Sequence, residues 1–448
     1  MNKRVLSVLA CLTLFSIGNL SAETNVEKAP LLLVKHAVSD SKGETAFTFH
    51  PTDYPNEPLK VSDLPIGVFD SGIGGLTVLE AILSSDKFHN KNLKPGPDGL
   101  PDLENESFIY LGDSANMPYG NYPSEDKVDT LREHIVKDVV FLMGRRYWKN
   151  VATKKPSFDK PPVKAVVIAC NTATAYGIED IREAFESWNV PVIVVGVVEA
   201  GARGVKSVWD KKSKEAVAVY ATVGTCKSKA YPKSIQMTLG RAGYGPAVVV
   251  QQGSVELAGT IEGTLTDKTV DEVVREDIRI LLERHRENSL QAKLAPTPIG
   301  TVILGCTHYP LAEREIDKAF SYWAEWKDGK GNSVFKPWIA EERTFVDPAS
   351  WTARELFVEL AKARIRKKTS GRNPTQFFVS VPHPEGPGKL NEEKTGFTYQ
   401  YKYGREANQL SVEDTKIVPM SFDRLPKASQ NLIREKLPNV AKAILETP

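Results

Sequence analysis

Two cysteines follow short apolar segments of the kind that form buried parallel strands. Cys170 comes directly after residues 165–169, and Cys306 comes one glycine after residues 301–304. Because ligands of open α/β sheets bind at the carboxyl ends of the strands, we expect both thiols to lie at such an edge. A helix that starts just after each cysteine would lower the pKa of its thiol. The two positions therefore predict thiols that take part in chemistry.

Two facing thiols can invert a carbon stereocentre without a metal or a cofactor. One thiolate removes a proton from one face of the carbon, and the other thiol returns a proton to the opposite face. Each base needs a neighbouring group that handles its proton. The candidates are Asp70, at the end of the first apolar segment, and His308, two residues after Cys306. A single buried cysteine is more often a packing residue, but two in equivalent contexts favour chemistry.

The elements that must position these residues alternate along the chain. Short apolar segments predict strands over residues 66–69, 108–111, 165–169, 192–195, 216–220, 247–251 and 301–304. Helical spacing of apolar residues predicts helices over 76–83, 130–143, 178–188, 229–240, 270–285 and 350–364. This alternation is typical of an α/β fold with largely parallel sheets, here arranged in two halves.

Four polar stretches interrupt the pattern and are longer than typical connections. They are residues 86–106, 144–162, 323–343 and 366–411. Their composition favours surface decoration over a binding role. A further residue, Cys226, is expected to be a packing residue, because a lone thiol is usually a small buried apolar group.

The N-terminus predicts a secretory signal peptide over residues 1–22. Two basic residues precede an apolar segment at 5–17, and small residues lead to Ala22, where we expect cleavage. An uncleaved membrane anchor is the alternative. Cleavage would leave a periplasmic protein without stable membrane insertion, beginning with an N-terminal extension over residues 23–63. It would also remove Cys11 and leave three widely spaced cysteines, which exclude a disulfide framework.

The composition excludes several classes of protein. With 41% apolar and 25% charged residues the chain is globular rather than disordered or fibrous. Lys and Arg number 58 and Asp and Glu number 56, so the net charge gives no general basic field for nucleic acid. The histidines show no metal-ligand spacing with one another or with the cysteines. We therefore expect no metal and no nucleic acid, and a small molecule as the partner.

Several motifs resemble those of the glutamate racemases, within the aspartate/glutamate racemase superfamily. The segment Ile66–Val78, which reads IGVFDSGIGGLTV, resembles the opening signature of that family, and Ala169–Ala173 and Gly305–Leu311 are similar to its two cysteine motifs. The remaining markers follow in order and comprise Tyr110–Asp113, Pro118–Gly120, Gly196–Glu199, Ala221–Thr225 and Phe345–Ala349. The resemblance covers about residues 64–360.

The resemblance implies interconversion of L- and D-glutamate by two acid/base cysteines, Cys170 and Cys306, with Asp70 and His308 assisting them. Positions implied to contact the amino-acid substrate are Asp70, Ser71, Pro118, Tyr119, Gly120, Asn171, Thr172, Thr225, Thr307 and His308. The family uses no pyridoxal phosphate and no metal. Its two α/β domains enclose the active site in a cleft, which here implies one domain over 64–200 plus 347–448 and another over 201–346. A homodimer is compatible with this arrangement.

Two departures from the family pattern leave questions open. The family's Cys-Pro segment, whose carboxylate assists the second half of the site, is replaced around Gln251–Ser254, and both Glu256 and Glu262 could stand in for that carboxylate. A signal peptide is also unusual, since these racemases serve wall synthesis from the cytoplasm. Aspartate or a broader set of amino acids is therefore an alternative substrate class. A catalytically silent periplasmic binding protein is the alternative outside enzymes, although binding alone needs no pair of thiols.

Overall fold

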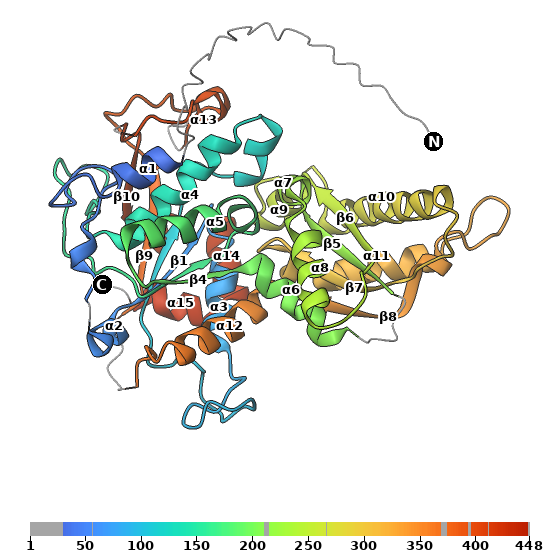
Figure 1. Ribbon diagram of the computed structural model, residues 1–448. Coiled ribbons are helices and arrows are strands. Elements are labelled where there is room, and N and C mark those ends of the chain that lie inside the picture. Colours follow the sequence, from blue (N-terminus) through green and yellow to red (C-terminus); the bar gives the residue numbers. More distant parts are fainter. Residues whose placement is uncertain are drawn as a thin grey trace, which may run out of the picture.

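The computed structural model describes residues 30–446, apart from residues 56, 210–214, 266, 369–373, 393–395 and 411. The expected signal peptide at 1–22 and the first residues of the extension lie outside the described residues. Figure 1 shows two α/β units side by side, each built around its own sheet. The expected α/β fold with two parallel-sheet-based units is confirmed.

The first sheet has six strands in the order β10-β9-β2-β1-β3-β4. Its strands are β1 (Ile66–Asp70), β2 (Phe108–Gly112), β3 (Ala165–Ile168), β4 (Ile193–Gly196), β9 (Gln376–Pro382) and β10 (Thr415–Pro419). All neighbours are parallel except β9 and β10. In register, Asp70 pairs with Gly112 and Phe69 with Ile168, so β1, β2 and β3 end together at one edge.

The second sheet has four strands in the order β6-β5-β7-β8, all parallel. Its strands are β5 (Ala216–Thr222), β6 (Val249–Ser254), β7 (Ile299–Gly305) and β8 (Ile339–Val346). The strand β7 is buried along its whole length, as expected of a strand whose sequence is apolar apart from Thr301. We keep 64–200 plus 347–448 and 201–346 as the proposed domain limits.

Helices cover both sheets and connect them. The helices of the first unit are α1 (Leu31–His36), α2 (Pro58–Asp63), α3 (Leu76–Ser84), α4 (Val128–Met143), α5 (Asn171–Trp188), α12 (Pro348–Lys362), α13 (Tyr399–Gly404), α14 (Lys427–Lys436) and α15 (Pro438–Leu445). The helix α6 (Val197–Val208) leads from β4 into the second unit, whose helices are α7 (Val223–Ser228), α8 (Ala230–Arg241), α9 (Leu257–Glu262), α10 (Val270–Gln291) and α11 (Glu313–Glu325). Asp347 caps α12, where the chain returns to the first unit, by accepting the Ala349 N–H at 2.9 Å.

The described part of the N-terminal extension packs into the core of the first unit. Leu33, Val34 and Phe49 are buried there. Trp188 of α5 donates its indole N–H to the Val34 carbonyl at 2.8 Å, and its ring meets Phe49 edge-on with centroids 4.9 Å apart. The apolar residues of this short segment therefore give it a fixed place on α5.

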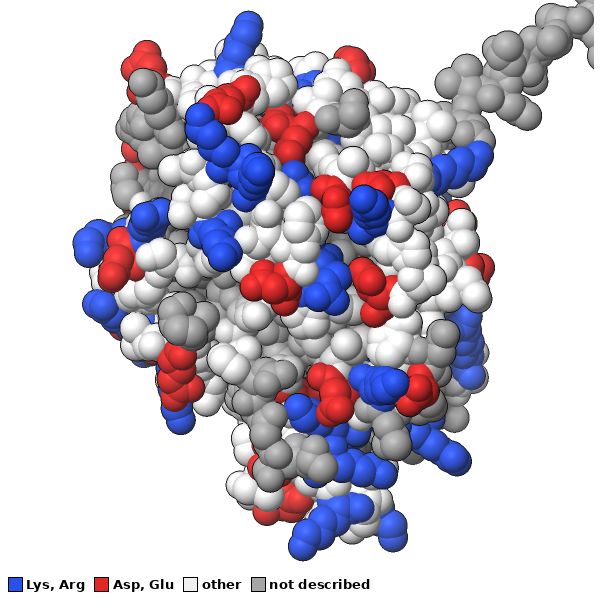
Figure 2. All heavy atoms as spheres, turned by 90° about the vertical axis from the view of Figure 1, so that its left-hand side faces the viewer, with Lys and Arg blue, Asp and Glu red and all other residues white. Residues whose placement is uncertain are grey.

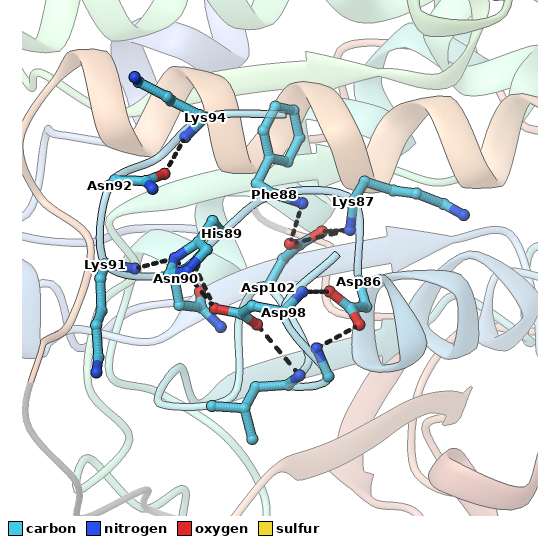
Figure 3. A network of polar contacts seen from close by, with 12 residues as sticks. Asp86, Lys87, Phe88, His89, Asn90, Lys91, Asn92, Lys94, Asp98 and Asp102 are labelled. Carbon is cyan, nitrogen blue, oxygen red and sulfur yellow. Dashed lines mark hydrogen bonds and ion pairs between the residues drawn. The ribbon is translucent and has the colours of Figure 1, made fainter. Parts of the chain in front are cut away.

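The insertion at 86–106 is ordered by its own carboxylates (Figure 3). Asp86 accepts the backbone N–H groups of Asp98 and Gly99, and Asp102 accepts those of Lys87 and Phe88. These carboxylates are thus used as caps for the loop backbone. Among the described residues no group of three or more His, Cys, Asp or Glu side chains has a metal-binding arrangement.

The expectation that residues 366–411 are surface decoration is wrong. The strand β9 lies inside this stretch and extends the first sheet by pairing with β2. Its apolar residues Phe377 and Phe378 are buried in the first core. Part of the 323–343 stretch is likewise structural, because β8 begins at Ile339 and joins the second sheet.

The surface carries both signs of charge. Figure 2 shows Lys and Arg interspersed with Asp and Glu over the face that it presents. Within the described ranges, no helix combines the length and apolar character that crossing a bilayer requires.

Candidate active site

A cavity of about 650 Å³ lies between the two units, at the carboxyl ends of their strands. The first unit contributes Asp70 at the end of β1, Ser71 directly after it and Cys170 after β3, and the second contributes Ser254 at the end of β6 and Cys306 after β7. The wall also includes Pro118, Tyr119, Gly120, Asn171, Thr172, Glu262, Thr307 and His308. The structure therefore brings both cysteines and nearly all expected site residues to one cavity.

Cys170 is held between the end of β3 and the start of α5. The Ala173 N–H donates to its Sγ at 3.4 Å, so that the thiol caps the helix, and the thiol faces the Ser71 hydroxyl at 3.8 Å. Asp70, on the neighbouring strand, accepts the backbone N–H groups of Gly72 and Gly75 at 3.2 and 2.9 Å. A parallel β1–β3 pair thus sets a carboxylate beside a thiol.

The pKa of the Cys170 thiol differs from what its position before a helix predicts. Burial raises the pKa of the Cys170 thiol, and the negative charge of Asp70 raises it further. The Ala173 N–H at the helix N-terminus acts in the opposite direction but is outweighed. Burial likewise raises the pKa of Asp70, against the charge of His308 and the N–H groups of its own loop. The prediction of a lowered thiol pKa is therefore wrong for Cys170.

Cys306 contacts a histidine that in turn contacts a carboxylate. Its Sγ lies 3.8 Å from Nδ1 of His308, and Nε2 of His308 lies 2.7 Å from Oε1 of Glu262. All three side chains are buried. Glu262 is the last residue of α9, which ends at Gly263 with φ +74°, a conformation that favours glycine. Glu256 forms an ion pair with Lys268 at the surface instead.

The pKa of His308 is set by opposing effects of burial and of its partners. Burial alone lowers its pKa, but the charge of Glu262 and the hydrogen bonds with Cys306 and Glu262 outweigh burial and raise the pKa well above its ordinary value. The loop after β1 packs directly on this ring, because a Cβ at Gly74 would lie 2.4 Å from its Cε1. His308 therefore links the second unit to the Asp70 loop of the first.

Three threonines join the two units, two of them in the cavity wall and one beneath it. Thr172 of α5 lies 3.1 Å from Thr225 and 3.3 Å from Thr222, measured between hydroxyl oxygens. Thr225 is fully buried and lies outside the wall, whereas Thr222, which we did not predict, is part of it. Thr222 ends β5, so the strand-end rule that identified the cysteines could have found it.

Two other expected contact residues are engaged by side chains outside the wall. The Tyr119 hydroxyl contacts Asp113 at 2.6 Å and Asp138 at 2.8 Å, and Tyr231 donates to Oδ1 of Asn171 at 2.6 Å. The Tyr119 hydroxyl is therefore occupied by buried carboxylates, and the Asn171 side chain is held by Tyr231.

The wall contains further residues that sequence reasoning missed. They are Met117, Asn121, Ser124, Glu125, Thr222, Val223, Ser254, Val255, Ala258, Gly259, Thr264, Leu265 and Tyr399. Ser254 is the last residue of β6 and could have been found by the strand-end rule. Among the described residues that line the cavity none is Lys or Arg, so neutral donors and His308 supply its contacts to a negative ligand.

Comparisons with known proteins place these features in a family. Residues 150–324 match the family model described as Asp/Glu/Hydantoin racemase. The chain is 30% identical over 316 residues to the glutamate racemase of Geobacter metallireducens, covering 70% of this chain and 87% of that protein. It is also 30% identical over 341 residues to the glutamate racemase of Clostridium novyi, covering 75% of this chain and 99% of that protein. A crystal structure of a glutamate racemase isoform from Bacillus anthracis superposes with a TM-score of 0.49 at 27% identity, covering 71% of this chain and 89% of that chain.

Proposed function

This chain belongs to the glutamate racemase family, and from that membership we propose that it interconverts L- and D-glutamate by a two-thiol mechanism that needs no cofactor. Membership makes it an amino-acid racemase, an isomerase. The observation that carries the finer proposal is that Cys170 and Cys306 come from different units, line one cavity, and each has its own proton-handling partners.

The proposed reaction moves one proton off Cα and another onto it. A thiolate on one wall takes the Cα proton, so that the Cα–H bond breaks and an S–H bond forms. The resulting carbanion is planar and loses its handedness. The thiol on the opposite wall then gives its proton to the other face, so that its S–H bond breaks and a new Cα–H bond forms. In the reverse direction the two cysteines exchange roles.

The two cysteines have different partners for this proton exchange. Asp70 lies beside Cys170 and can take the thiol proton, which converts a buried thiol into a base. A protonated His308, held by Glu262, can donate its Nδ1–H to a thiolate on Cys306. Bound substrate adds an ammonium group, whose positive charge favours a thiolate. Buried, fixed partners of this kind stabilise charge without reorganisation during the reaction.

We expect glutamate to be turned over better than aspartate, and both far better than alanine or lysine. The wall offers neutral groups, including Ser71, Asn171, Thr172 and Thr307, that can bind two carboxylates. A shorter substrate leaves some of these polar groups unpaired, at a cost of about 1–3 kcal/mol each. Measuring kcat/KM for the four amino acids tests the order. A preference for lysine would contradict an acidic substrate while leaving the two-thiol chemistry intact.

We also propose that the mature enzyme acts in the periplasm. The support is the sequence of residues 1–22, in which a basic start, an apolar segment and small residues follow one another. Expression of the full chain in a Gram-negative host, followed by fractionation and mass spectrometry of the N-terminus, tests this. We expect a periplasmic chain that begins at Glu23, and a cytoplasmic chain that keeps residues 1–22 would contradict the proposal.

A further inference from the structure

Tyr399 lies in the wall of the same cavity as the two thiols, although it belongs to the 366–411 stretch that breaks the α/β pattern. We infer that Tyr399 closes the outer end of the substrate cavity and thereby limits the size of the amino acid that the site accepts. This rests on the proposed function and assigns a specificity-determining role to the short helix α13. Figure 1 shows α13 at the periphery of the first unit, at the top of the view.

The first support is that residues of α13 form hydrogen bonds with both ends of the loop at residues 117–125. Lys402 donates to the Met117 carbonyl, and Tyr403 donates to the Pro118 carbonyl at 3.2 Å. At the other end of the loop Tyr399 donates its hydroxyl to Glu125 at 2.7 Å. Met117, Pro118 and Glu125 all line the cavity. The helix is therefore attached to the loop that forms this part of the wall.

The second support is that α13 is itself held rigidly. Thr398 caps the helix by accepting the Tyr401 N–H at 3.2 Å. The ring of Tyr403 is buried and lies with its centroid 4.6 Å from that of Tyr399 and 4.8 Å from that of Tyr122. The ring of Tyr399 thus rests against a fixed aromatic neighbour.

The third support is a buried charged residue directly after α13. Arg405 donates to Asp414 and to the side-chain oxygen of Asn116, each at 2.6 Å, and to the Tyr122 hydroxyl at 3.2 Å. These bonds join the chain that follows β2 to the segment between α13 and β10. Buried, paired guanidinium groups fix geometry in this way because an unpaired charge there is costly.

Tyr399 lies partly exposed in the cavity wall, where its ring can limit the space for a substrate side chain. The residue is 53% exposed, so its ring is only partly covered by protein. Its hydroxyl contacts the carboxylate of Glu125, and the same cavity wall also includes the apolar Leu265. Truncating the ring opens the cavity without touching either thiol. We therefore expect the size limit to relax while the proton-transfer groups stay in place.

The test compares glutamate with 2-aminoadipate, whose side chain is one methylene longer. The measured quantity is the ratio of kcat/KM for 2-aminoadipate to that for glutamate. We expect Tyr399→Ala to raise this ratio by about tenfold, the lower end of what one methylene is worth in a pocket. Tyr399→Val should raise it less, and Tyr399→Phe, which keeps the ring, should leave it within about twofold of wild type.

A purely structural role predicts a different result, since partial unfolding lowers both kcat/KM values together and leaves the ratio unchanged. Tyr322→Ala is the matched control, because Tyr322 is a comparably exposed tyrosine (45%) on α11 and lies outside the cavity wall. A ratio that stays within twofold of wild type in both Tyr399→Ala and Tyr399→Val would overturn the inference. If the wild-type chain does not racemise glutamate, the proposed function fails first and the inference falls with it.

Discussion

Replacing Cys306 by alanine is expected to lower racemisation in both directions by about 10²–10⁴-fold or more, the range for losing a general acid or base. The same loss is expected for Cys170→Ala. Each direction of the reaction uses one thiol as base and the other as acid, so neither variant keeps a complete pathway. Chiral chromatography of the product from pure L- or D-glutamate measures the loss.

The third thiol of the described chain is the matched control. Cys226 lies on α7 outside the cavity wall, and burial raises its pKa to about 12. We therefore expect Cys226→Ala to keep near-normal racemisation. Near-normal activity of Cys306→Ala in both directions would show that the two-base assignment is wrong.

Replacing His308 by asparagine should lower kcat by about 10²-fold, because the group that handles the Cys306 proton is lost. The milder change Glu262→Gln keeps the imidazole and removes the charge that raises its pKa. A histidine with a raised pKa stays protonated up to that pKa and loses its charge only above it. Lowering the pKa therefore removes the imidazolium at lower pH, and we expect the alkaline limb of the kcat/KM profile to move to lower pH.

Glu256→Gln provides the comparison for this experiment. Glu256 precedes the same short helix, yet it forms a surface ion pair with Lys268 rather than a contact with the histidine. Its removal should leave both kcat and the pH profile unchanged. An alkaline limb that does not move in Glu262→Gln would show that Glu262 does not set the pKa of His308. It would then remain open which of the two carboxylates assists the second half of the site.

The strands that carry the site could be predicted because a strand buried on both faces has a continuous apolar sequence. This holds for β3, for β1 up to Phe69 and, apart from Thr301, for β7, and these strands end before Cys170, at Asp70 and before Cys306. The parallel arrangement then brings those ends together, so the same rule predicted the position of both thiols. Thr222 and Ser254, at the ends of β5 and β6, follow it as well.

The part of the cavity wall that α13 contributes could not be predicted from the apolar pattern of the strands. The helix α13 has the sequence YQYKYG, which lacks the apolar spacing of a buried helix, and it is placed by hydrogen bonds to a loop far away in the sequence. The strand β9 lies within a largely polar stretch, and its pairing with β2 and β10 shows that it belongs to the sheet. The contribution of Tyr399 therefore depends on tertiary contacts alone.

The sequence alone also could not predict the direction in which the pKa of the Cys170 thiol is shifted. Its place before a helix predicts a lowered thiol pKa, and the helix N–H does act in that direction. Complete enclosure and the neighbouring Asp70 reverse the result, and both depend on how β1 and β3 pair. Likewise the sequence left Glu256 and Glu262 equivalent, and only the tertiary contacts show that Glu262 meets His308 while Glu256 pairs with Lys268.

The fate of the Cα proton tests the two-thiol account most directly. Purified enzyme is given L-glutamate in deuterated water, and both enantiomers are analysed by mass spectrometry at low conversion, with the converse run from D-glutamate. A thiol that has exchanged its proton with solvent before the substrate binds donates deuterium. The account therefore predicts product that carries deuterium at Cα in both directions, while the unreacted substrate still carries protium. Product that retains the substrate's own protium would show that one group serves both faces, and this would contradict the account.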